Sequence, residues 1–484
     1  MPELSAQRFN KNIIFVSAGI LLVSIFTAIL TNEILLCLAP LAFLLAYQLL
    51  IDFRPVFYLL LLITPLSIEF AISDGFSTDL PTEPLEIILM FTFIFYVILR
   101  RENINVAFLN HPVTIILLLH FLWMCIATIY SQNTFVSFKY MLAKTWYISV
   151  FYFLASHVIR KPEHFRIAFW CLFIPTLFAV LYTLTNHYRY NFAFSEVNKT
   201  MFPYFRNHVN YAVFLALLLP FLFYAQSWYQ KYTWHKMIIR LGIGLLLAGV
   251  YFSYTRSAWL SLLAAGMCYL LIRKNLLRQF VVLAVTGAVV FVIYMLNDNR
   301  YLAYAPDFKK TIYHANFEDH MESTISLEDV SSAERIYRWI AATHMVEDKP
   351  VLGFGPAQYY DNYKEYTVNK FLTYISTNDE RSTVHNYFLQ VTVEQGFVGL
   401  FFWVLLLISV LFFSQIAYNS ADKKQDKNYI LALTLSLITI IVNITLSDLV
   451  EADKIGTLFF FNLAMIVNMH LAVKKQQTKD LLAE

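Results

Sequence analysis

A histidine and three arginines lie where long apolar segments begin or are interrupted. His385 stands directly before an apolar run, and Arg206 and Arg256 each stand at the start of an earlier run. Arg335 lies in the polar stretch 297–385. Neutral imidazole can accept a proton, and guanidinium binds phosphate oxygens through paired hydrogen bonds. A site that contained these groups could hold a pyrophosphate beside a general base.

Each of these side chains also suits an ordinary structural role. A histidine at the end of an apolar run can be an interfacial residue, and an arginine there can extend its charged group from a helix end into water. Three histidines of the polar stretch lack the spacing of a zinc-binding helix: His314, His320 and His344. The four cysteines lie in separate apolar runs, as buried small hydrophobes would. We therefore predict no metal site and no disulfide framework.

Glu394 is the first carboxylate in the run that follows His385. In an α-helix, nine residues correspond to about 13 Å and put the two side chains near opposite faces. Contact between them would need a break in the helix, for example near Gly396. Carboxylates within membrane segments are functional candidates, but we interpret Glu394 as a structural polar contact.

The composition is that of an integral membrane protein. Of the 484 residues, 58% are hydrophobic and 14% are charged, whereas soluble domains have about 45–50% apolar and about 25% charged residues. An apolar helix needs about 20 residues to span a bilayer. Fourteen runs predict an all-α polytopic membrane protein with about 12–14 transmembrane helices: 13–31, 34–50, 55–73, 84–99, 112–130, 141–158, 166–185, 207–225, 237–254, 257–272, 279–296, 386–413, 429–449 and 455–472.

These runs divide the chain into three parts. We predict an N-terminal membrane bundle of about 11 helices over residues 1–296 and a long outer loop over residues 297–385. Residues 386–484 then form the C-terminal membrane helices and a cytoplasmic tail. The first run, 13–31, is too long for a typical signal-peptide core, so we interpret it as a spanning helix.

The long outer loop is predicted to contain short helices. Ser331 or Ser332 could cap a helix that ends before Pro350. That helix could lie at the membrane surface, or it could cover the outer end of the bundle.

The basic residues predict the orientation in the membrane. With the N-terminus placed in the cytoplasm, 20 of the 36 Lys and Arg residues fall on the cytoplasmic side, and nine lie in the long outer loop, which the positive-inside rule does not count. The short outer loops hold seven: Lys139, Lys144, Arg189, Lys199, Arg206, Arg256 and Lys454. This bias predicts that both termini are cytoplasmic and that the long loop faces outward.

Three stretches, in this order, resemble the O-antigen ligase and O-antigen polymerase family of bacterial surface-polysaccharide enzymes. They are "YTRSAWLSLL", "AERIYRWIAATHMVEDKPVLGFGPAQYY" and "HNYFLQVTVEQGFVGLF". The pattern is an Arg-Ser turn between two helices, an Arg-led helix in a long outer loop, a Leu-Gly-x-Gly turn, and His-Asn at the start of the next helix. The resemblance covers about residues 206–410. The N-terminal half resembles the family only in being hydrophobic, and the fourteen runs exceed the roughly twelve spans usual in ligases.

The resemblance implies a metal-independent membrane glycosyltransferase that needs no cofactor. Family members take a glycan from undecaprenyl pyrophosphate; ligases pass it to the lipid A core, and polymerases pass it to another repeat unit. His385 matches the essential histidine, Arg256 and Arg335 match two pyrophosphate-binding arginines, and Arg206 matches a further one. The implied location is the bacterial inner membrane with the active site facing the periplasm. The implied partners are the lipid-linked donor, the acceptor glycan and membrane lipids, with no nucleic acid.

The expected reaction is O-antigen ligation to the lipid A core. The arginines would stabilise the pyrophosphate leaving group, and His385 would take the proton of the acceptor hydroxyl. A single displacement inverts the anomeric centre. We expect a partly solvated imidazole whose pKa stays near neutrality.

Two alternatives remain open at this level. The first is an O-antigen or exopolysaccharide polymerase that uses the same chemistry with another acceptor. The second, of a different class, is a polytopic transporter or flippase. A transporter more often carries charged residues within its helices or paired broken segments in two matched halves, and the polar residues of interest here concentrate on the outer face.

Single cysteines introduced at Ser323 and Ser420 test the predicted orientation. We expect a membrane-impermeant thiol reagent to label Ser323→Cys and not Ser420→Cys in intact cells with a permeabilised outer membrane. Both variants should react after lysis, and the unmodified chain measures the background from the native cysteines. Labelling at position 420 and not at 323 would invert the topology.

Overall fold

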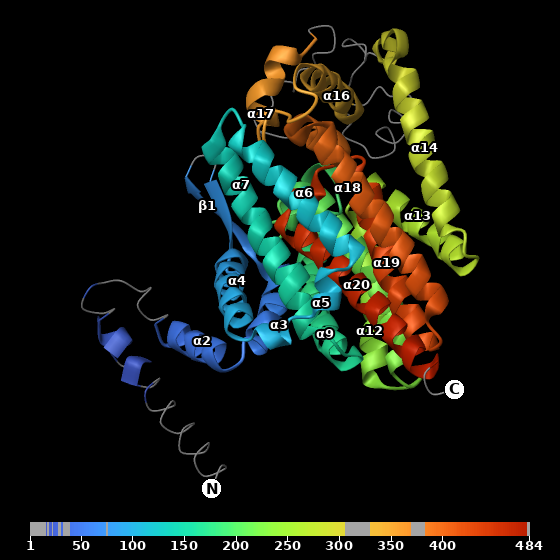
Figure 1. Ribbon diagram of the computed structural model, residues 1–484. Helices are drawn as coiled ribbons and strands as arrows, with labels where there is room; N and C mark the ends of the chain where they lie inside the picture. The colour runs from blue at the N-terminus through green and yellow to red at the C-terminus, as the bar shows by residue number, and fades with distance from the viewer. Residues whose placement is uncertain are drawn as a thin grey trace.

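Helices form nearly all of the described part of the chain (Figure 1). The computed structural model describes residues 39–73, 76–304, 330–368 and 383–481, together with residues 16, 19–21, 23–27 and 31. Among these, nine helices are long and apolar enough to cross a membrane, which confirms the predicted all-α polytopic membrane fold. They are α4 (Thr82–Leu99), α6 (Pro112–Ile129), α9 (Pro162–Tyr188), α11 (His208–Ala225), α12 (Trp234–Phe252), α14 (Leu277–Leu296), α18 (Tyr387–Ser420), α19 (Lys424–Ile444) and α20 (Asp453–Leu481).

Four shorter or more polar helical segments occupy other predicted runs. They are α2 (Ala39–Ile51), α3 (Arg54–Ile63), α13 (Arg256–Arg273), and α7 (Thr134–Tyr147) continued by the π-helical segment η4 (Ile148–Leu154) and by α8 (Ala155–Val158). The predicted run 13–31 lies largely outside the described residues. Short α- and 3-10-helical segments lie between the longer helices: η2 (Thr64–Leu66), η3 (Arg101–Asn103), α5 (Val106–Leu109), η5 (Phe194–Glu196), α10 (Val197–Met201), η6 (Gln226–Trp228), η7 (Asn297–Tyr304), α17 (Tyr359–Asn362), η8 (Tyr363–Tyr366) and η10 (Leu449–Glu451).

The prediction of one helix over 55–73 is wrong in its second half. α3 and η2 end by Leu66, and β1 (Ile68–Ser73) then pairs antiparallel with β2 (Phe76–Leu80). Pro65 supplies no backbone N–H for a continuing helix, and the isoleucines and the phenylalanine that follow favour a strand. The hairpin forms the only sheet among the described residues.

Successive spanning helices alternate in direction, so their connections gather at the two ends of the bundle. We call the end that contains residues 297–304, 330–368 and 383–386 the loop face. By alternation, the loop face also contains the hairpin and the connections at 189–207, 253–255 and 445–452. In Figure 1 the loop face is at the top, where α16 (Val330–Asp348), α17 and the start of α18 lie.

The C-terminal helices are part of the same apolar core as the helices that precede the long loop. α19 packs against α11 and α13, and α20 packs against α18 and η4. The apolar windows of α11 and α20 are each 72% buried, whereas that of α14 is 6% buried. α14 therefore exposes almost all of its apolar surface, which suits contact with lipid.

α16 is the helix that the sequence predicts between Ser331 or Ser332 and Pro350. Its buried face includes Tyr337, Ile340 and Met345. These side chains share a second, smaller core with Phe354 and with Val393 of α18. The buried face supports the interpretation of α16 as a helix that covers the end of the bundle.

α18 is interrupted at Gly396, where the backbone has φ 68° and ψ −176°. The residues after α16 fill the gap: the Phe354 and Gly355 N–H groups donate to the carbonyls of Val393 and Glu394, both at 2.9 Å. Phe397 N–H donates to the Pro350 carbonyl at 2.8 Å. Backbone groups in a membrane segment must find partners within the protein, and here the Leu-Gly-x-Gly turn supplies them.

The break at Gly396 generates a stability prediction. A Cβ at this position would lie 2.0 Å from the Val351 carbonyl oxygen, and this φ/ψ region is essentially restricted to glycine, at a cost of about 1–3 kcal/mol for other residues. We expect Gly396→Ala to lower the Tm of the detergent-purified protein by several degrees. Gly287→Ala in α14 is the matched control, because nothing lies within 4 Å of its added Cβ and alanine favours the helix. Equal Tm values for both variants would contradict the role of the break.

Candidate functional site

His385 lies directly before α18, in a left-handed backbone conformation with φ 54°. Asn386 is the N-cap of α18, and its side-chain oxygen accepts a hydrogen bond from the Leu389 N–H at 3.0 Å. The cap explains where the helix begins and leaves His385 just outside the first turn. A left-handed backbone is uncommon for a residue with a side chain, so the neighbouring contacts have to hold it.

α16 supplies those contacts through two consecutive side chains. Trp339 Nε1 donates to the Val384 carbonyl at 3.1 Å, and Arg338 Nη1 donates to the Thr383 carbonyl at 3.2 Å. Val384 itself is fully buried. The backbone of residues 383–385 is therefore tied to α16 immediately before the helix that His385 precedes.

Arg338 is itself held from both sides. Its guanidinium lies 3.6 Å from the Glu334 carboxylate, and both side chains are 5% exposed. The hydroxyl of Tyr359 donates to the Arg338 carbonyl at 3.2 Å. An ion pair that is this deeply buried is costly to break, because either partner alone would leave an uncompensated charge.

The electrostatic surroundings of His385 differ from our expectation. Burial, and then the positive charges of Arg338 and Arg335, lower the pKa of the His385 imidazole to about 3. The prediction of a near-neutral pKa is wrong, because α16 places two arginines next to a side chain that the sequence suggested would be solvated. The imidazole is uncharged at neutral pH and can accept a hydrogen bond or a proton.

Arg335 lies on α16 one turn before Trp339 and is partly buried. Its positive charge helps to lower the pKa of the His385 imidazole, and α16 contacts the residues just before His385 through Arg338 and Trp339. The structure thus brings together two of the four candidate residues, which are 50 positions apart in the chain.

Arg206 and Arg256 form the second pair. Arg206 is exposed and directly precedes Asn207, the N-cap of α11, just as His385 precedes Asn386. Arg256 is the first residue of α13 and is partly buried. The Thr255 hydroxyl donates to the His208 carbonyl at 3.2 Å, so the two helix starts lie side by side. The alternation of the helices places both pairs at the loop face.

Lys454 anchors the segment before Arg206. Its ammonium group donates to the carbonyls of Ser67 at 2.9 Å, of Pro65 at 3.3 Å and of Tyr204. It therefore joins the segment just before the hairpin, the start of α20 and the connection that ends in Arg206. Sequence reasoning treated Lys454 only as an outer-loop cation; its three carbonyl partners come from distant parts of the chain, and no local pattern indicates them.

Lys144 was also assigned to an outer loop, and the structure corrects this. It lies in α7 with a side chain that is 5% exposed, and its ammonium group is 2.9 Å from the Glu451 carboxylate. Tyr140 donates to the other oxygen of that carboxylate at 2.5 Å. The ion pair, which joins residues about 300 positions apart, explains how a lysine is buried inside an apolar segment.

Glu394 holds the turn that follows α16. Its carboxylate accepts hydrogen bonds from Gln390 at 3.4 Å and from the backbone N–H groups of Ala357 and Tyr359. The break in α18 lies at Gly396, after Glu394, so it does not bring Glu394 to His385. These contacts support the structural interpretation of this carboxylate.

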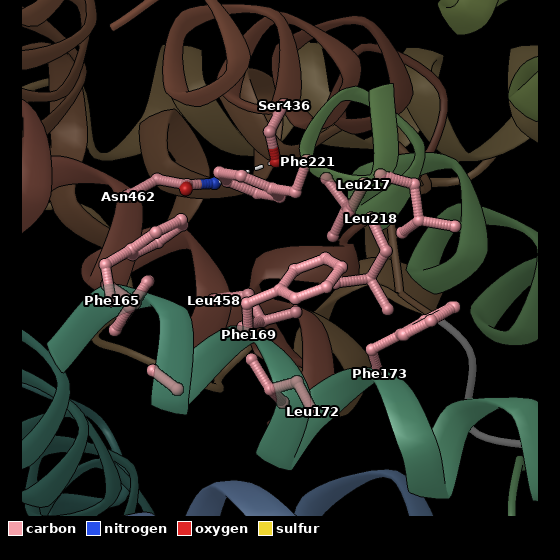
Figure 2. A pocket seen from close by; sticks show the side chains of 13 residues that line it. Phe165, Phe169, Leu172, Phe173, Leu217, Leu218, Phe221, Ser436, Leu458 and Asn462 are labelled. Atoms are coloured by element: carbon pink, nitrogen blue, oxygen red, sulfur yellow. Dashed lines mark hydrogen bonds between the residues drawn. The ribbon is translucent and has the colours of Figure 1, made fainter. Parts of the chain in front are cut away.

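Two further features bear on what the site can bind. Within the described ranges, no cluster of three His, Cys, Asp or Glu side chains could hold a metal ion; His314 and His320 lie outside those ranges. A cavity of about 20 Å³ lies between α9, α11, α19 and α20 (Figure 2). Its lining is aromatic and aliphatic apart from Ser436 and Asn462, which hydrogen-bond each other at 3.0 Å. It has room for about one water molecule and contains none of the four candidate residues.

One comparison with known proteins matches part of the chain. Residues 241–404 match the family model described as O-antigen ligase. A search of curated proteins found no match to the chain. The matched range includes Arg256, α16, the turn that fills the break in α18, and His385, and it leaves out Arg206 and Lys454. Residues 241–404 are therefore similar to O-antigen ligases, and they lie in a chain whose described part contains nine helices long and apolar enough to cross a membrane.

Proposed function

We propose that the chain transfers a glycan from undecaprenyl pyrophosphate to a sugar hydroxyl of the lipid A core. The observation that carries this proposal is the arrangement at the start of α18, where an uncharged imidazole is tied to a helix that presents arginines beside it. A base next to fixed cations suits a reaction in which a hydroxyl loses a proton while an anionic group departs.

Arg335, Arg256 and Arg206 bind the pyrophosphate in this proposal. All three lie at the loop face, at or near the starts of helices. Guanidinium groups stay charged and pair with phosphate oxygens in a planar, two-bond geometry. The same groups stabilise the charge that develops on the leaving pyrophosphate, and no metal ion is assigned to the reaction.

His385 acts as the general base. The hydroxyl oxygen of the acceptor attacks the anomeric carbon, the imidazole takes its proton, and the bond to the phosphate oxygen breaks with the electron pair leaving on pyrophosphate. One displacement of this kind inverts the anomeric centre. Bound pyrophosphate offsets the positive charge of Arg335 and Arg338, so we expect donor binding to raise the pKa of His385 from about 3 and to make it a stronger base.

The loop face is the outer face of the inner membrane in this proposal, and both termini are cytoplasmic. The donor's isoprenoid chain lies in the bilayer, and the acceptor arrives from the periplasm. Only the boundary between lipid and water reaches both substrates, and the position of His385 and the arginines at or near helix starts supports a site at that boundary.

A ligase and a polymerase differ in the acceptor, so the products of a deletion strain separate them. Loss of the lipopolysaccharide ladder with accumulation of lipid-linked polymer indicates the ligase. A product that carries a single repeat indicates the polymerase. Glycan transfer by the purified protein without an ion gradient excludes the transporter alternative as an account of the activity.

Replacement of the arginines tests donor binding. We expect Arg256→Ala and Arg335→Ala to abolish transfer while the protein remains in the membrane, because pyrophosphate loses a paired donor. The lysine variants should recover only part of the activity, since an ammonium group is a point charge. The measurement is in-vitro transfer together with the amount of protein in the membrane fraction. Full activity in both Arg256→Ala and Arg256→Lys would identify Arg256 as an ordinary helix-end cation.

Replacement of the histidine tests the base. We expect His385→Ala to reduce transfer by about 10²–10⁴-fold, as removal of a general base typically does, and undecaprenyl pyrophosphate to bind as before. His385→Gln keeps a polar side chain but cannot accept the proton, so it should be equally impaired. Transfer is measured at several pH values alongside donor binding. A wild-type rate in His385→Gln would return the residue to an interfacial role.

A further inference from the structure

We infer that Arg338, together with its partner Glu334, is a positioning residue that directs His385 toward the reacting groups and is not itself a donor ligand. The inference rests on the proposed function, and it divides the two arginines of α16 between two tasks. Arg335 contacts the donor, and Arg338 acts through the backbone of residues 383–385.

The first observation is how the Arg338 guanidinium is used. One terminal nitrogen faces the Glu334 carboxylate at 3.6 Å, and the other donates to the Thr383 carbonyl at 3.2 Å. The side chain is 5% exposed. A pyrophosphate would have to displace one of these buried partners, and the buried charge that remained would be costly.

The second observation is the number of tethers on one short segment. Arg338 and Trp339 are neighbours in α16, and they bind the carbonyls of two neighbouring residues, Thr383 and Val384. On the other side of His385, Asn386 is fixed as the N-cap of α18. With both flanks fixed, the backbone of His385, at φ 54°, and hence the direction of its Cα–Cβ bond, is fixed as well.

The third observation is that α16, which contacts the segment before His385, is itself attached to the membrane helix α18. The Tyr359 hydroxyl donates to the Arg338 carbonyl, and the Tyr359 N–H donates to the carboxylate of Glu394 in α18. α16 is therefore joined to the chain before His385 through Arg338 and Trp339, and to α18 after His385 through Tyr359. A displacement of the base by about 1 Å in such a site can cost about 10²-fold in rate.

Three variants test the inference. Arg338→Met removes both contacts and the charge, whereas Trp339→Phe removes only the hydrogen bond to Val384 and keeps an aromatic ring in place. Glu347→Gln is the matched control, because Glu347 lies on the same helix and is exposed. The readouts are kcat for transfer, the Kd for undecaprenyl pyrophosphate, and the pH profile of kcat/KM between pH 4.5 and 8, each for protein that elutes as a folded species.

We expect Arg338→Met to lower kcat by about 10²-fold and to change the Kd for undecaprenyl pyrophosphate by less than about twofold. Trp339→Phe should lower kcat in the same direction, also without loss of donor binding. Removal of the Arg338 charge removes one of the causes that lower the pKa of His385, while burial and Arg335 remain, so in Arg338→Met the fall in kcat/KM at the acid end of the profile should begin at a higher pH than in the wild type. Trp339→Phe should show no such shift, because its His385 pKa stays near 3.

A Kd that rises along with the fall in kcat would make Arg338 a donor ligand and overturn the inference. A wild-type kcat in both Arg338→Met and Trp339→Phe would also overturn it. If His385→Gln is inactive in that case, the proposed function stands and only the positioning role fails. If His385→Gln is fully active, both the general-base role of His385 and the positioning role of Arg338 are contradicted. Should Arg338→Met not fold, Trp339→Phe decides the positioning role by the same split between kcat and Kd.

Discussion

The joint at Gly396 is the constraint on which the site depends. A helix that breaks inside a membrane leaves backbone carbonyls that water cannot reach. In this chain the N–H groups of Phe354 and Gly355 and the indole of Trp123 satisfy the carbonyls of residues 393–395. The turn that follows α16 is thereby fixed inside the bundle. This junction holds the end of α16 against α18. It thereby helps to position Arg335 and Arg338, which α16 carries, and the segment before His385 that α16 contacts.

The polar groups of the bundle are of two kinds: candidate site residues at the loop face and buried ion pairs. Two candidate residues, Arg206 and His385, directly precede a helix. Asn207 and Asn386 are the N-caps of these helices, so the residue before each cap lies outside the helix. Other charges pair with each other, as Lys144 and Glu451 do at 2.9 Å. Buried pairs of this kind add little net stability, because desolvation offsets their attraction. They do specify which helix ends meet, because either partner alone would be strongly destabilising.

The low pKa of His385 illustrates how a neighbouring helix can change the protonation state of a residue that it contacts. α16 contacts the segment before His385 through Arg338 and Trp339, and the charges of Arg338 and Arg335 disfavour the protonated form of the imidazole. The resting site therefore keeps an uncharged base next to fixed positive charge. The proposed anionic donor complements this arrangement, because its negative charge offsets the positive charges that lower the pKa of His385.

Several features follow from the sequence alone because their physical cause is local. The apolar runs predict membrane helices, since about 20 apolar residues in a row have no other stable placement. The serines near residue 331 and the proline at 350 predict the bounds of α16. The ordered motifs from Arg256 to His385 indicate the O-antigen ligase family, and the family match covers the same region. The failure at 55–73 is also local in origin: Pro65 and β-branched residues outweigh a hydrophobic count there.

Other features depend on contacts between residues far apart in the chain, and the sequence carries no signal for them. The partners of Lys454 are Pro65, Ser67 and Tyr204, so a lysine that reads as an outer-loop charge becomes a buried anchor. The pKa of His385 depends on α16, which lies 50 residues away at Arg335. The Glu334–Arg338 spacing is visible in the sequence, but its contact with Thr383 is not. Residue types and their order thus determine which chemistry this chain can carry. Only the packing of α16 against α18 decides which arginine contacts the segment before His385 and how the imidazole is charged, because burial and electrostatic fields arise from the whole fold.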